Sequence, residues 1–198
     1  MSNETMFFER QTLSLTLIEK ELYRLYTNLS EKVEDMAAQT MLSYIATDSL
    51  KHFKILAKII EEVDGFRARE QDCTENIRYA KKVIKALVKK AERSKRIDRN
   101  GFIALIDTLI GFEELLYSEY KKAFHLEYTW FSERELEKDS EVDLNIFDLI
   151  VGDEDRHKKI LLSLVRFCDR KLSFNKNAPV VKYKSPDSWY VPPRGRRS

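Results

Sequence analysis

Apolar residues recur every three to four positions along most of this chain, a period that is typical of amphipathic helices. Breaks such as Asp64-Gly65 and Asn100-Gly101 fall between the periodic stretches, and a glycine after a polar residue commonly ends a helix. The pattern predicts five helices, at about residues 12–34, 35–63, 74–94, 102–128 and 144–171. It also predicts a loop at residues 66–72, and a loop or a broken helical turn at residues 129–143.

The helical period stops at about residue 173. Residues 174–198 hold all four prolines and carry six Lys and Arg residues against one Asp, a net charge of +5. The chain is therefore predicted to have two parts, a helical bundle domain at residues 1–173 and a basic extended tail at residues 174–198. Apolar residues in the tail, such as Val180 and Trp189, favour either a strap on the bundle or a docking peptide for a partner.

The composition agrees with an all-α fold. The 198 residues include only five Gly and four Pro, and 34% are charged, which favours long helices over a sheet with many turns. The net charge of +2 gives no reason to expect nucleic acid as a partner. No apolar run approaches the roughly 18 residues that a membrane span needs. We therefore expect a soluble, cytoplasmic protein without membrane contact.

The predicted third helix and the residues after it form a strongly basic segment, residues 81–99. A solvated outer face of an amphipathic helix explains this charge, and we favour that interpretation. A contact surface for an anionic partner is the alternative. If the partner were a nucleic acid, its affinity would fall steeply with salt concentration.

The candidate chemistry begins with Glu154 and His157. These residues lie three apart within the apolar run of the fifth predicted helix, so their side chains project from the same helix face. That face also carries Phe147, Ile150 and Leu161. A carboxylate and an imidazole in an apolar core are costly unless they have partners. A metal ion would satisfy both.

Three further polar residues lie on the apolar faces of the other long helices. Glu19 and Glu113 occur on the first and fourth predicted helices, and His52 occurs on the second. Each glutamate is followed seven residues later by a tyrosine, Tyr26 or Tyr120. Taken singly, each glutamate reads as a boundary residue and His52 as a hydrogen-bonded core residue. Their matching order indicates instead a twofold internal repeat of an acid-bearing helix and a histidine-bearing helix.

This arrangement resembles the ferritin-like superfamily and, within it, the rubrerythrin-like di-iron carboxylate proteins. Their four-helix bundles hold two metals with one Glu from each of two helices and a Glu-x-x-His pair from each of the other two. The resemblance covers about residues 12–171 and makes the basic helix an addition between the second and third bundle helices. It implies that Glu19 and Glu113 are the single-Glu ligands, and that Glu154 and His157 form one complete Glu-x-x-His pair.

The second Glu-x-x-His pair is incomplete, because Ser49 stands where the glutamate would precede His52. A serine hydroxyl is a poor ligand for a hard metal. Asp48 lies one turn before His52, where it could act as a ligand or simply orient the ring. With Asp48 as the substitute, the predicted ligands are Glu19, Asp48, His52, Glu113, Glu154 and His157. Without Asp48, the site would hold one metal or none.

The resemblance implies oxidase or peroxidase chemistry, in which two iron ions react with peroxide or oxygen; manganese and zinc are the alternative metals. Cys73 and Cys168 form no Cys-x-x-Cys pair, so electrons would come from an external donor. Tyr26 and Tyr120 could hydrogen-bond the ligands or simply fill the core. The resemblance also implies a homodimer. The competing hypothesis is a metal-poor or metal-free structural bundle that binds a partner through its basic helix and tail.

Overall fold

The computed structural model describes residues 3–62, 66–93, 97, 99–133 and 146–170. These residues form five α-helices and one 3₁₀ turn, without a β-strand: α1 (Asn3–Ser30), α2 (Met36–Glu62), η1 (Glu70–Asp72), α3 (Glu75–Arg93), α4 (Arg99–Glu133) and α5 (Ile146–Arg170). The all-α prediction is therefore confirmed. The predicted tail at residues 174–198 and most of the predicted loop at residues 129–143 lie outside the described residues.

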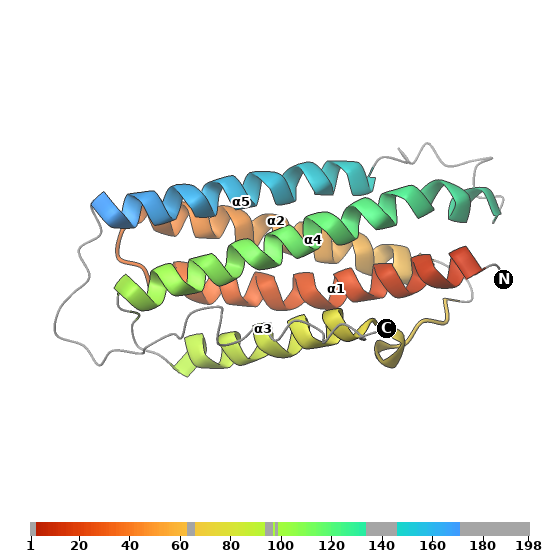
Figure 1. The fold of residues 1–198 in the computed structure, drawn as a ribbon, viewed down its shortest axis with the longest axis horizontal. Coiled ribbons are helices and arrows are strands. Elements are labelled where there is room, and N and C mark those ends of the chain that lie inside the picture. Colours follow the sequence, from red (N-terminus) through yellow and green to blue (C-terminus); the bar gives the residue numbers. More distant parts are fainter. Residues whose placement is uncertain (1–2, 63–65, 94–96, 98, 134–145, 171–198) are drawn as a thin grey trace, which may run out of the picture.

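Four long helices, α1, α2, α4 and α5, lie side by side along the long axis of the molecule (Figure 1). Helix α1 contacts α2 and α4, and α5 contacts the same two helices, so the four enclose a common core. Helices α1 and α5 run in one direction and α2 and α4 run in the other (Figure 1). The chain returns along the bundle through α3, which packs against the outer side of α1.

Helix α1 begins at Asn3, about nine residues before the predicted start. Phe8 is fully buried there, and its ring packs edge-on against Phe147 with 5.7 Å between ring centroids. The buried polar residues of this early segment have partners on other segments: Gln11 donates to the carbonyl of Glu119 on α4 at 3.2 Å, and Glu9 accepts from the backbone N–H of Arg67 at 2.9 Å. The next polar residues bond within the helix. The hydroxyl of Thr12 donates to the carbonyl of Phe8 at 2.9 Å, and that of Thr16 donates to the carbonyl of Thr12 at 2.7 Å. Hydrogen bonds within the helix and to other segments thus allow α1 to bury polar residues between α2, α3 and α4.

Helix α4 continues to Glu133 and so includes the first five residues of the predicted loop at 129–143. The prediction of a loop or a broken helical turn is wrong for these residues, which continue α4. Helix α1 ends at Ser30, four residues before the predicted end, and α4 begins at Arg99, three residues before the predicted start. The remaining predicted helix boundaries agree with the structure to within about two residues, the usual uncertainty of helix ends.

Helix α3 carries its apolar residues on the side that faces α1. The buried set comprises Ile77, Ala80, Val83, Ile84, Leu87, Val88 and Ala91. Basic residues such as Lys82 and Lys89 are exposed, whereas Lys81 is buried and pairs with Glu70 at 2.7 Å. A solvated amphipathic helix therefore accounts for the described part of the basic segment. None of the described helices has the length and apolar character that a membrane span requires.

Candidate metal centre

Five of the six predicted ligands meet at the centre of the bundle. Glu19 comes from α1, His52 from α2, Glu113 from α4, and Glu154 and His157 from α5. All five side chains are at most 1% exposed. The helical period explains this convergence, because each residue occupies the inward stripe of its helix at the same level of the bundle.

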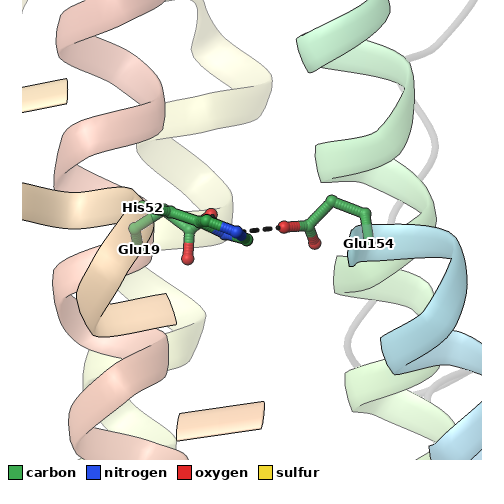
Figure 2. A group of neighbouring side chains, drawn as sticks. All are labelled: Glu19, His52 and Glu154. Atoms are coloured by element: carbon green, nitrogen blue, oxygen red, sulfur yellow. Dashed lines mark hydrogen bonds and ion pairs between the residues drawn. The ribbon is translucent and has the colours of Figure 1, made fainter. Parts of the chain in front are cut away.

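The five residues form two groups that share Glu154. Glu19 and His52 meet Glu154 in one group (Figure 2), and Glu113 and His157 meet it in the other. Within each group, the three ligand atoms lie within 4.8 Å of one another. The Nδ1 atom of His52 is 3.1 Å from Oε1 of Glu154, and Nδ1 of His157 is 3.8 Å from Oε2. The two oxygens of one carboxylate thus face two different histidines, as a bridging ligand would.

Each histidine also contacts the glutamate of its own group. Nδ1 of His52 lies 3.1 Å from Oε1 of Glu19, and Nδ1 of His157 lies 3.2 Å from Oε2 of Glu113. The two imidazole centroids are 5.9 Å apart. The centre therefore consists of two similar Glu–His halves, joined by one carboxylate.

The two buried tyrosines connect these halves. The hydroxyl of Tyr120 donates to Oε1 of Glu19 at 2.6 Å, and the hydroxyl of Tyr26 donates to Oε1 of Glu113. Each tyrosine thus contacts the glutamate that lies on the other tyrosine's helix. Burial raises the pKa of both hydroxyls, and the nearby carboxylates raise it further. Both tyrosines remain protonated donors at neutral pH.

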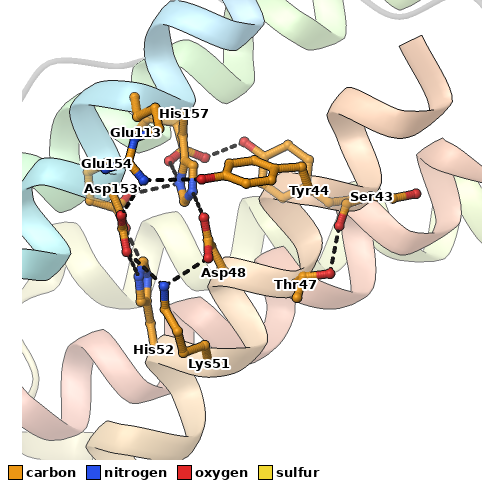
Figure 3. Close-up of polar contacts among 12 residues, drawn as sticks. Ser43, Tyr44, Thr47, Asp48, Lys51, His52, Glu113, Asp153, Glu154 and His157 are labelled. Atoms are coloured by element: carbon orange, nitrogen blue, oxygen red, sulfur yellow. Dashed lines mark hydrogen bonds and ion pairs between the residues drawn. The ribbon is translucent and has the colours of Figure 1, made fainter. Parts of the chain in front are cut away.

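Asp48 belongs to neither group. Its Oδ2 atom lies 3.3 Å from Nε2 of His157, on the side of the ring opposite Glu113 (Figure 3). Asp153 takes the equivalent place behind His52, with 3.1 Å between Oδ2 and Nε2. Lys51 joins the two aspartates, with Nζ 2.8 Å from Asp48 and 2.9 Å from Asp153. The structure therefore gives Asp48 a contact with a histidine, where the sequence analysis expected a sixth ligand.

The roles of Asp153, Lys51 and Arg156 were not predicted from the sequence. The guanidinium of Arg156 donates to Oδ1 of Asp153 at 2.7 Å, as Lys51 donates to Asp48. A direct comparison of residues 48–52, DSLKH, with residues 153–157, DEDRH, would have found all three. Aspartate, a basic residue and histidine recur at the same positions, and each aspartate reaches the histidine of the other segment.

The carboxylates of the centre differ in how well they are satisfied. Both oxygens of Glu154 and Oε2 of Glu19 are buried without a hydrogen-bond partner among the described residues; the 3.1 Å contact between Glu154 and His52 lacks hydrogen-bond geometry. Burial, together with repulsion by Glu19 and Glu113, raises the pKa of Glu154 to about 8. The hydrogen bond to His157 lowers the pKa of Asp48 to about 2.

The histidines are held in the charged form. Burial alone would lower the pKa of His52, but Glu19 and the other nearby carboxylates raise it to about 11. Burial alone would likewise lower the pKa of His157, but Asp48, Glu113 and Glu154 raise it to about 12. The carboxylates of the centre therefore favour a positive charge in each half.

Two divalent cations fit this donor set. Carboxylate oxygens and imidazole nitrogens are the common ligands of iron, manganese and zinc. Cations would give the three unpaired oxygens a partner, which offsets the cost of burying them. Buried carboxylates that converge with three oxygens unpaired have no evident structural use, so the centre has the chemistry of a cation site. Comparison with known proteins finds no family model, no curated protein and no solved structure that matches this chain.

Proposed function

We propose that this chain is a ferritin-like protein of the rubrerythrin type that binds two iron ions and reacts with peroxide or oxygen. The observation that carries the proposal is the position of Glu154, whose two oxygens face two separate Glu–His pairs. One cation would be held by Glu19 and His52, the other by Glu113 and His157, and Glu154 would lie between them.

The course of the chain supports the ferritin-like assignment. Helices α2 and α4 are consecutive in the bundle but run in the same direction, so the connection between them spans its length (Figure 1). Ferritin-like bundles contain one long crossover of this kind. In this chain the crossover contains α3, which agrees with the helix that the sequence analysis placed between the second and third bundle helices.

The residues behind the ligands would prepare the two histidines for metal binding. A neutral imidazole that donates its Nε2 proton to an aspartate leaves the Nδ1 lone pair free for a cation. Asp48 and Asp153 are placed to accept these protons from His157 and His52, respectively. Lys51 holds the two aspartates together, so each histidine ring is oriented from the opposite helix.

The buried site would also exclude bulk water from the place where the oxidant is reduced. Iron(II) at this centre would supply the electrons for the reduction of peroxide or oxygen. Tyr26 and Tyr120 orient Glu113 and Glu19, respectively, through hydrogen bonds, and the apolar core around them excludes bulk water. An external donor would have to return the electrons, because the two cysteines of the chain form no Cys-x-x-Cys pair.

Anaerobic titration with iron(II), followed by peroxide or oxygen, tests this proposal. We expect two iron ions per chain and their oxidation when either oxidant is added. The double variant E154A/H157A should bind no iron and show no iron oxidation. D155A is the matched control, because Asp155 lies between the two ligands but pairs outwards with Lys159 at 2.6 Å. Failure of the wild-type chain to bind iron would refute the proposal.

A further inference from the structure

The two halves of the centre differ at one position. Ser49 precedes His52 by three residues, as Glu154 precedes His157, and three-residue spacing places both residues of each pair on the same face of the helix. Ser49 is only 2% exposed. The repeat thus supplies one carboxylate between the two halves, where a complete repeat would supply two.

The charges around the centre also indicate that one carboxylate is missing. The proposed ligands carry three carboxylates, Glu19, Glu113 and Glu154, whereas two divalent cations carry four positive charges. Asp48 and Asp153 do not make up the difference, because their charges are balanced by Lys51 and Arg156 at 2.7 to 2.9 Å. One positive charge is therefore left for an anionic ligand that is not part of the chain, because an uncompensated charge in the core is costly.

The side chain of Ser49 also limits the size of the missing group. A serine hydroxyl occupies the place of the γ-carbon of a glutamate, so what Ser49 lacks, relative to glutamate, is the carboxylate group itself. A free carboxylate of the same size is formate. Acetate has an additional methyl group, which would compete for space with the hydroxyl of Ser49.

We propose that the Ser49 side of the centre binds a small monovalent carboxylate, of the size of formate, as a second bridge between the two cations. This inference rests on the proposed dinuclear site. The bound anion would replace the missing glutamate in both charge and position. Because the hydroxyl of Ser49 limits the space beside the metals, this site would accept formate more readily than acetate. The S49A variant removes the hydroxyl and would therefore reduce that preference.

Titration of the cobalt(II)-loaded full-length chain with formate tests the inference, with visible absorption of cobalt as the readout. We expect a saturable spectral change with one formate per two cobalt ions, and an affinity for acetate weaker by at least about tenfold. S49E should abolish the formate response, because its own carboxylate would fill the position. S43E adds the same charge to an exposed position on α2 and should keep the response.

The outcomes separate this inference from the proposed function. A chain that binds no cobalt refutes the dinuclear site itself. A chain that binds two cobalt ions but gives no formate response, or the same response in S49E, refutes the carboxylate site alone. If S49E does not fold, S49A decides the question: an unchanged preference for formate over acetate in that variant contradicts the inference.

Discussion

Glu154 should destabilise the metal-free protein, and E154Q should therefore stabilise it. Burial, together with Glu19 and Glu113, raises the pKa of Glu154 from 4.5 to about 8. Between these two values the folded chain holds a proton that the unfolded chain releases. The free energy of unfolding contributed by Glu154 therefore falls as pH rises through this window.

The magnitude follows from the two pKa values. Keeping Glu154 protonated in the folded state costs about 3 kcal/mol at pH 7 and about 1 kcal/mol at pH 5. Glutamine cannot ionise and so avoids this cost, although its buried amide offsets part of the gain. We expect E154Q to raise the free energy of unfolding of the metal-free protein by about 1–3 kcal/mol at pH 7 and by less at pH 5.

Urea unfolding of chelator-treated protein at both pH values measures this effect. The matched control is E114Q, because Glu114 is the neighbour of Glu113 but is exposed; it should change stability by less than about 0.5 kcal/mol. With metal present the order should reverse, since cation binding stabilises only the wild-type chain. If E154Q instead destabilised the metal-free protein equally at both pH values, Glu154 would be a structural residue and the reasoning would be wrong.

F8A should lower the free energy of unfolding by about 3–5 kcal/mol because it opens a cavity in the core, whereas F7A, at an exposed position, should change it little; equal effects would contradict the early start of α1. D48N should weaken metal binding about 10- to 100-fold in equilibrium titrations. An unchanged affinity would show that Asp48 does not contribute to metal binding. Binding of two cations at pH 7 should release about three protons to a pH indicator, because His52 and His157, with pKa values of about 11 and 12, and Glu154, with a pKa of about 8, must each lose one. The metal affinity should therefore rise with pH between pH 6 and pH 8, and an affinity independent of pH would contradict the protonation states given above.

The sequence predicted the helices and five converging residues because both depend on helical period. Glu19, His52, Glu113, Glu154 and His157 are all polar residues on apolar stripes, and a stripe that packs inwards takes its polar residues with it. The start of α1 was missed for the opposite reason. The polar residues Glu9 and Gln11 are buried there because they bond to Arg67 and Glu119, and sequence hydropathy does not register partners so distant in the chain.

The role of Asp48 could not be predicted from its own helix. Its partner, His157, lies on α5, and a contact between helices depends on how the helices pack against each other. Lys51 and Asp153 were missed for the same reason. In the sequence each is an ordinary charged residue, and their ion pair joins two different helices. The repeat of DSLKH and DEDRH was the one sequence signal that linked them.

Elemental analysis of the protein purified without chelators tests the central claim most directly. The account predicts about two transition-metal ions per chain in the wild-type protein and D155A, and a loss of both in E154A/H157A. A wild-type chain that contains no metal and takes up no iron(II) anaerobically would contradict the account, whatever the geometry of its buried carboxylates.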